Sequence, residues 1–127
     1  MILLLDTTVL LDVLRARQNR RSLLAELVGG GHVLATAAIN IGEVYAGMRR
    51  GEENRTETFL SSLDCYPITW AIARRAGSLK SAWAHKGRTL SLADMMVAAT
   101  ALEHGLSLVT DNRKDFPLSE LNFYPLP

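Results

Sequence analysis

The residues best suited to chemistry in this sequence are acidic side chains that border predicted strands and helices. Asp6 directly follows one short apolar run, and Asp111 directly follows another, with Asp115 a short turn beyond it. Glu43 and Asp94 fall near the beginnings of two predicted helices. In an open parallel sheet, binding sites form outside the carboxyl ends of the strands, where the following helices begin. We therefore expect these carboxylates to meet at one edge of a sheet, although they are scattered along the chain.

Carboxylates gathered in one place repel one another, raise each other's pKa values and require a positive charge between them. A hard divalent cation such as Mg²⁺ meets this requirement, because it prefers oxygen ligands and is commonly held by one or two carboxylates together with water. Such an ion activates water and neutralises charge on a phosphate. The histidines and Cys65 show no zinc-ligand spacing. The acidic residues therefore predict metal-assisted cleavage of phosphodiesters.

Most of these acidic residues, taken alone, also have a purely structural explanation. Asp6 could form a turn at the end of a strand, and Asp111 could belong to an ordinary turn with Asn112. Ser91 and Asp94 have the spacing of a capping box, in which the acidic residue supports the start of a helix. Only their convergence on one edge points to a functional site.

Glu43 is harder to explain as a structural residue. On a helix, its neighbours form a stripe of apolar and small residues: Ile39, Gly42, Ala46 and Gly47. Such a stripe predicts close packing, and a buried glutamate without a partner is rare, so a charge there requires a functional reason. Asn40, one turn earlier, could orient it.

Short apolar runs alternate with segments of helical periodicity along the chain, and turn and cap residues separate them. Strands are predicted at 2–5, 33–35, 66–69 and 106–110, with a last short one at 123–126. Helices are predicted at 7–15, 19–28 (or from 22), 38–50, 52–63, 70–86 and 91–104.

Strands that alternate with helices predict an α/β fold, in which a parallel sheet is covered by helices on both faces in three layers. At 127 residues the chain fits a single domain, residues 1–127, and has no room for a second core. The core is expected to include both tryptophans, Trp70 and Trp83. It is also expected to include a helical stripe formed by Met95, Met96, Ala99 and Leu102.

Composition excludes several other classes of protein. Hydrophobic residues make up 48% of the chain and charged residues 21%, which is typical of a globular protein rather than a disordered one. No apolar run approaches the roughly 20 residues of a membrane-spanning helix, and no basic leader of a signal peptide is expected. The net charge is +1, so any nucleic-acid contact must come from a local patch. A single cysteine, Cys65, fits a reducing, cytoplasmic location.

Four segments of the chain resemble the PIN-domain family and, within it, the small VapC-type ribonuclease toxins of toxin–antitoxin pairs. Their order, their spacing and the total length agree with the family, and the resemblance covers the whole chain. An Asp-Thr-Thr motif alone is weakly specific, but the ordered set is strongly specific. The segments are LLLDTTVL (3–10), INIGEVYAG (39–47), LADMMVAATA (92–101) and LVTDNRKDF (108–116).

The resemblance implies a Rossmann-like α/β/α sandwich with a five-stranded parallel sheet, and cleavage of RNA that depends on Mg²⁺ or Mn²⁺. The first three acids of the family map onto Asp6, Glu43 and Asp94. We expect Asp6 and Asp94 to bind the metal directly. Glu43 is expected to bind it through water or to orient the water that attacks the phosphate.

The fourth acid of the family is less clear in this sequence. The position two residues after Thr110 holds Asn112, a variant common in the family that carries no charge. Asp115 is the preferred fourth acid, and Asp111 is the second choice. Supporting hydrogen bonds are expected from four polar residues: Thr7, Asn40, Thr110 and Asn112.

As partners, the resemblance implies an RNA substrate, a VapB-like antitoxin that inserts into the groove, and usually a second copy of the chain in a homodimer. No membrane association is expected. Arginine, which grips phosphate through paired hydrogen bonds, is the commonest basic residue of the chain. Each arginine could equally be a solvated surface residue. The candidates for holding the RNA backbone are Arg15, Arg17, Arg20, Arg21, Arg49 and Arg50.

Two other functions compete with the nuclease. An aspartyl-phosphate protein, either a phosphatase or a receiver-like switch, would use Asp6 as a nucleophile. Such phosphatases require a second Asp where this chain has Thr8, and a receiver requires a Lys for which only Lys114 is available. A non-catalytic nucleic-acid or protein-binding module would use the acidic edge only to sequester cations, and the balanced charge gives it no support.

Overall fold

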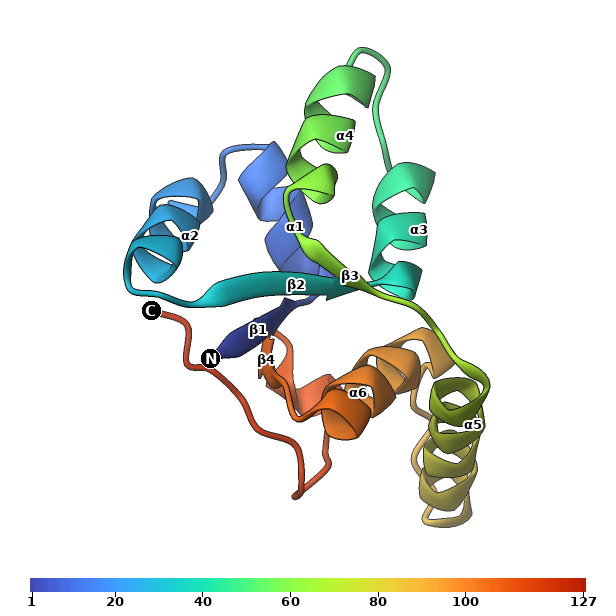
Figure 1. Cartoon of the computed structure of the whole chain (residues 1–127). Helices are drawn as coiled ribbons and strands as arrows, with labels where there is room; N and C mark the ends of the chain where they lie inside the picture. Colours follow the sequence, from blue (N-terminus) through green and yellow to red (C-terminus); the bar gives the residue numbers. More distant parts are fainter.

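A parallel sheet of four short strands forms the centre of the computed structural model, which describes residues 1–127 (Figure 1). The strands lie in the order β3-β2-β1-β4, so the first strand is flanked by the second and the fourth. All neighbouring strands run parallel. The strands are β1 (Ile2–Leu5), β2 (Val33–Ala37), β3 (Asp64–Tyr66) and β4 (Ser107–Val109).

Helices connect the strands and cover both faces of the sheet (Figure 1). Each crossover between parallel strands contains two of them, as a connection from one end of the sheet to the other requires. None of these helices has the length and hydrophobicity that crossing a bilayer demands. The helices are α1 (Thr7–Leu14), α2 (Arg20–Gly29), α3 (Ala38–Ala46), α4 (Glu53–Ser61), α5 (Trp70–His85) and α6 (Leu92–His104), and a short 3-10 turn, η1 (Arg113–Asp115), follows β4.

Side chains of β1 point alternately to the two faces of the sheet, and this alternation divides the core in two. Leu3 and Leu5 pack with buried residues of α1, α2, α3 and α4 in one cluster. Leu4 packs with buried residues of α5 and α6 in the other. All three leucines are fully buried. The first strand is therefore held from both faces, and so is the residue that directly follows it.

The carboxyl ends of β1 and β4 lie side by side at one edge of the sheet. Leu5 is paired with Val109, and the amide of Asp6 donates a hydrogen bond to the Val109 carbonyl at 3.0 Å. On the other side of β1, β2 ends at Ala37 and leads directly into α3. The residues that follow β1, β2 and β4 therefore lie together at this edge.

The expected strand at 123–126 is wrong, and the sheet has four strands rather than five. Only Phe123 forms an isolated bridge, to Leu108 of β4. Pro125 and Pro127 have no amide hydrogen, so the segment cannot extend the pairing.

Among the other boundaries, the largest differences from the expected ones are in the third strand and in α3. The third strand lies at Asp64–Tyr66 rather than 66–69, because Pro67 ends the pairing instead of beginning it. Helix α3 ends at Ala46, four residues early, and Gly47 is its C-cap.

The expectation that Trp70 belongs to the core is wrong, because its exposed fraction is 86%. Trp70 is the first residue of α5, and the buried face of that helix is set by Ile72 and Ala76. Trp83 is partly buried and packs against the core. The stripe on α6 lies as expected, with two of its members fully buried (Met95, Ala99) and two partly buried (Met96, Leu102).

Candidate functional site

Asp6 is a buried acid at the junction of β1 and α1, with an exposed fraction of 6%. Its Oδ1 accepts a hydrogen bond from the Thr7 amide at 2.9 Å, which caps α1. Its Oδ2 accepts from the Thr110 hydroxyl at 2.8 Å. Burial raises the pKa of Asp6, and the charges of Glu43 and Asp115 raise it further, against the lowering effect of the two hydrogen bonds. Asp6 thus has a capping role, but its second oxygen and its electrostatics belong to a larger cluster.

Glu43 is oriented by a chain of polar contacts that begins at Asn40. The Asn40 Oδ1 accepts from the Ala37 amide at 3.2 Å, so its Nδ2 is the atom that faces Thr7, at 3.0 Å from Oγ1. Because the Thr7 hydroxyl accepts that hydrogen bond, its own proton is directed to Glu43 Oε1, 2.7 Å away. We expected Asn40 to orient Glu43, and it does so only through Thr7.

The close packing expected around Glu43 is not present in this chain. Glu43 itself is exposed, and so are three members of the stripe, Gly42, Ala46 and Gly47, while Ile39 is partly buried. The carboxylate of Glu43 is therefore accessible to solvent and to a substrate.

Asp94 lies in the first turn of α6, where its amide donates to the Ser91 hydroxyl at 2.9 Å. Partial burial raises the pKa of its carboxyl to about 6, and the charge of Asp6 is the next largest cause. Asp115 and Glu43 raise it further. Glu43 and Asp115 thus lie close enough to Asp6 and Asp94 for their charges to raise the pKa values of these two carboxyls, and we call the four acids Asp6, Glu43, Asp94 and Asp115 the acid cluster.

Asp111 and Asp115 lie in the same loop but in different environments. Asp111 Oδ1 is 2.7 Å from a guanidinium nitrogen of Arg20, which is 3% exposed. The Arg20 Nε lies 3.8 Å from Asp12 Oδ2, so this cation stands between two carboxylates. Asp115, on η1, contributes to the raised pKa values of Asp6 and Asp94, whereas Asp111 does not.

Thr110 connects this loop to the acid cluster. Its hydroxyl donates to Asp6 and accepts a hydrogen bond from the amide of Asn112 at 3.0 Å. Asn112 therefore contributes its backbone rather than its side-chain amide to the observed contacts.

The acid cluster offers oxygen donors only, and none of its members forms an ion pair with Lys or Arg. Its side chains do not form a ready-made group of three ligands around a common point. A hard divalent cation is commonly held by one or two carboxylates with water completing its shell. The donor chemistry and the unrelieved repulsion therefore fit such a cation, although the carboxylates are not gathered around it in advance.

The six arginines that are candidates for binding RNA differ in their burial and in their contacts within the protein. Arg20 is buried in its ion pairs with Asp12 and Asp111, which leaves its guanidinium little access to a substrate. Arg15 donates to the Gly47 carbonyl at 3.0 Å, and Arg21 donates to the Val13 carbonyl at 2.8 Å, so both support helix ends. The remaining three, Arg17, Arg49 and Arg50, are exposed.

One contact between two segments that carry site residues was not expected from the sequence. The guanidinium of Arg88, in the loop between α5 and α6, donates to the backbone carbonyl of Lys114, the residue before Asp115. The available signal was a short basic run, residues 85–88, shortly before the helix that carries Asp94.

Comparison with known proteins agrees with this geometry. The family model described as PIN domain matches residues 3–120. The chain is 34% identical over 115 residues to Ribonuclease VapC19 of Mycobacterium tuberculosis, covering 91% of this chain and 92% of that protein. It is 33% identical over 118 residues to Ribonuclease VapC10 of the same organism, covering 93% and 88%.

Solved structures show the same fold. The VapBC2 structure from Rickettsia felis, bound to a promoter DNA fragment, matches with a TM-score of 0.84 and 23% identity over the full length of both chains. A toxin-antitoxin complex from Klebsiella pneumoniae matches with a TM-score of 0.77 and 29% identity over 97% of each chain.

The raised pKa of Asp94 makes the stability of the metal-free protein depend on pH. Because the pKa is about 6 in the folded chain against an ordinary 3.8, the protonated form favours folding. That contribution is fully present below about pH 4 and is lost as the pH rises through about 6. In EDTA, we expect Asp94→Asn to raise the Tm relative to the unmodified chain at about pH 7.5, with the difference vanishing near about pH 4.

Thermal unfolding followed by circular dichroism measures this difference. Glu120→Gln, which removes an exposed carboxylate of the C-terminal segment, is the control for the loss of charge alone. A Tm difference for Asp94→Asn that stays constant across the pH range would contradict the assignment.

The buried cation of Arg20 makes a second prediction possible. Arg20→Met leaves the carboxylates of Asp12 and Asp111 without their partner, and we expect it to lower the free energy of unfolding by about 3 kcal/mol. The value is at the low end for a buried pair because the Asp111 side chain is 33% exposed. Urea denaturation checks it. The control Arg55→Met, at an exposed ion pair with Glu52, should cost less than about 1 kcal/mol, and equal losses would refute the distinction.

Proposed function

Because this chain belongs to the PIN-domain family and, within it, to the VapC-type ribonuclease toxins, we propose that it cleaves RNA at the acid cluster with a divalent cation as cofactor. The observation that carries the proposal is a group of four carboxylates without a basic partner at the carboxyl edge of the sheet, in which burial and then neighbouring acids raise the pKa values of Asp6 and Asp94. Neither the aspartyl-phosphate protein nor the non-catalytic binding module gains support from the family.

Asp6 and Asp94 are the proposed direct ligands of the metal. Each has a carboxyl whose pKa is raised by burial first and by neighbouring charge second, and a bound cation reverses the second effect. When bound, Mg²⁺, or Mn²⁺ in its place, lowers the pKa of a coordinated water and neutralises negative charge on the scissile phosphate. The hydrogen bonds from Thr7 and Thr110 keep the Asp6 carboxylate in one orientation.

Glu43 is the proposed residue for orienting the attacking water. Its Oε1 accepts the proton of Thr7, so its Oε2 remains available for a hydrogen bond from water. The chain from Asn40 through Thr7 fixes which oxygen is occupied. A glutamate held in this way positions the water for in-line attack on the phosphate and can receive its proton.

Asp115 is the proposed fourth acid. It adds to the repulsion on Asp6 and Asp94, whereas the charge of Asp111 is already paired with Arg20. The sequence preference for Asp115 therefore gains physical support, because an acid bound by a buried arginine is not available to a metal.

Single amide substitutions test the proposed site. In the presence of Mg²⁺ we expect Asp6→Asn and Asp94→Asn each to lower the rate of RNA cleavage by at least about a hundredfold, since each removes a metal ligand while keeping its size. Asp115→Asn should lower it by about tenfold or more, and Asp111→Asn should change it by less than about threefold.

Cleavage of a labelled total-RNA preparation, together with growth of cells that express each variant, measures these effects. Asp111→Asn is the matched control for Asp115→Asn, because both remove one carboxylate from the same loop. Retention of Mg²⁺-dependent cleavage by both Asp6→Asn and Asp94→Asn would overturn the metal site.

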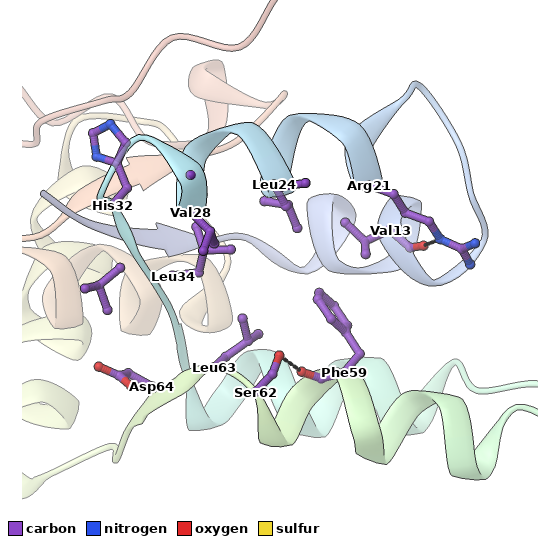
Figure 2. A pocket seen from close by; sticks show the side chains of 13 residues that line it. Val13, Arg21, Leu24, Val28, His32, Leu34, Phe59, Ser62, Leu63 and Asp64 are labelled. Atoms are coloured by element: carbon purple, nitrogen blue, oxygen red, sulfur yellow. Dashed lines mark hydrogen bonds between the residues drawn. The ribbon is translucent and has the colours of Figure 1, made fainter.

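An antitoxin of the VapB type is the proposed protein partner. The surface that suits it is an open groove of about 780 Å³ between α2 on one side and α4 with the start of β3 on the other (Figure 2). Figure 2 shows apolar side chains directed into this groove from both sides: Val13, Leu24, Val28, Leu34, Phe59 and Leu63. Apolar anchors of an amphipathic helix would fill such a groove. The Klebsiella relative is itself a toxin-antitoxin complex.

From the position of this groove we predict that a substitution can weaken antitoxin binding without loss of catalysis. Val28 is 57% exposed, so Val28→Asp should leave the fold and RNA cleavage unchanged while it reduces co-purification of a co-expressed VapB-type antitoxin by about tenfold or more. Ala82→Asp, which places the same charge on an exposed position of α5, is the control. Undiminished co-purification of the antitoxin with Val28→Asp would refute this docking site.

We also propose a homodimer. The face of α3 with exposed Gly42, Tyr45 and Ala46 has no partner within the chain, and small residues there would allow a second copy to approach closely. Sedimentation that detects only monomer at all concentrations would contradict it.

A further inference from the structure

Basic residues without acidic neighbours occupy the connection between α5 and α6. From Lys80 to Leu90 the chain contains no Asp or Glu. Lys80 is used internally, since its Nζ donates to the Leu90 carbonyl at 2.6 Å. Lys86 and Arg88 are exposed and form no ion pair. Their charge is therefore directed to solvent rather than balanced within the protein.

Trp83 holds both of these cations in place. The Lys86 Nζ lies 4.7 Å from the centroid of the Trp83 ring, and the Arg88 guanidinium carbon lies 5.9 Å from it. Between them, Gly87 has a φ of +87°, a left-handed conformation. This turn of the backbone allows the side chains of Lys86 and Arg88 to lie over the same Trp83 ring. Cation–π contacts of this kind restrict the side chains, so less entropy is lost when they bind a ligand.

Arg88 is connected to the segment that carries one member of the acid cluster, Asp115. Arg88 donates to the carbonyl of Lys114, and Lys114 directly precedes Asp115. Arg88 also lies in the loop that leads into α6, the helix that carries Asp94. On η1 itself, the guanidinium of Arg113 lies 4.9 Å from the centroid of Phe123 and is likewise restricted. We call the four residues Lys86, Arg88, Arg113 and Lys114 the basic rim.

We propose that the basic rim binds the backbone phosphates of the RNA beside the bond that is cleaved. This inference rests on the proposed ribonuclease function and names the surface by which the substrate is held. An uncompensated acid cluster repels a polyanion, so substrate binding requires cations close by that are not already paired. The rim residues form no ion pair, and Arg113 and Lys114 lie on the segment that carries Asp115, whereas Arg15 and Arg20 are paired with acidic side chains.

Contacts to phosphate carry no base identity, so the rim is expected to position RNA of any sequence. The choice of cleavage site must then come from other contacts. RNA affinity should also depend strongly on salt, because each phosphate that is neutralised releases counterions.

The test compares RNA binding by the full chain and by the double variant Lys86→Gln with Arg88→Gln. Glutamine removes the charge at both positions and keeps a polar side chain with an amide donor. The probe is a short fluorescein-labelled single-stranded RNA of mixed sequence, and anisotropy in EDTA measures binding without cleavage. We expect Kd to rise about tenfold, and the slope of log Kd against log salt to fall by about 0.7 for each phosphate that the variant no longer neutralises.

The matched control is Arg55→Gln with Arg74→Gln, which removes the same charge from two exposed arginines that lie outside the rim and outside the candidates for holding RNA. It should leave both Kd and the salt slope within about twofold of the unmodified chain. Equal weakening by the control, or an unchanged Kd in the rim variant, would overturn the proposal. A Lys86→Arg variant with Arg88 intact should retain RNA affinity, which separates charge from folding.

Cleavage in Mg²⁺ distinguishes this inference from the function on which it rests. The rim variant should raise KM with kcat nearly unchanged, because the phosphate contact is made equally in the ground state and the transition state. If the unmodified chain cleaves no RNA, the proposed function fails. If it cleaves RNA and the rim variant has an unchanged KM, only the rim fails.

Discussion

Repulsion among partly desolvated carboxylates is the constraint on which the site depends. Asp6 is buried and Asp94 partly so, and for both the loss of hydration raises the pKa before neighbouring charges add to it. Hydrogen bonds from Thr7 and Thr110 favour the charged form of Asp6 and offset part of that cost. The folded chain therefore holds an arrangement that a bound cation would stabilise.

The two acidic residues of the loop after β4 have different roles. Asp111 and Asp115 are four residues apart, yet one is fixed by a buried arginine and the other faces the acid cluster. The contact with Arg20 also joins this loop to the start of α2. One ion pair thus lowers the charge near the site and anchors the backbone that carries the remaining acid.

Local signals explain what could be predicted from the sequence. The apolar run of β1 and the Ser91 cap with the terminal Gly105 of α6 are encoded by neighbouring residues, so these elements and the edge they share were correctly expected. Asp6 follows β1 directly, and α6 leads back to the start of β4, so the first turn of α6, which carries Asp94, lies toward the edge where the strands end.

Long-range contacts explain what could not be predicted. The pairing of Arg20 with Asp111 joins residues 91 positions apart, and no local sequence pattern predicts it. The exposure of Trp70 depends on which face of α5 meets the sheet, and hydrophobicity alone does not fix that face. Glu43 was assigned to a packed stripe because small residues surround it, but a helix at the surface can present such a stripe to solvent.

The two outer strands of the sheet differ in how they meet solvent. Beside β4, the backbone around Phe123 occupies part of the outer hydrogen-bonding edge. On the other side, β3 is open but contains only three residues, begins with the charged Asp64 and is followed by Pro67. A short, charged edge closed by proline is a poor template for strand addition by another chain. Neither edge of the sheet therefore offers a long row of free backbone groups to another chain.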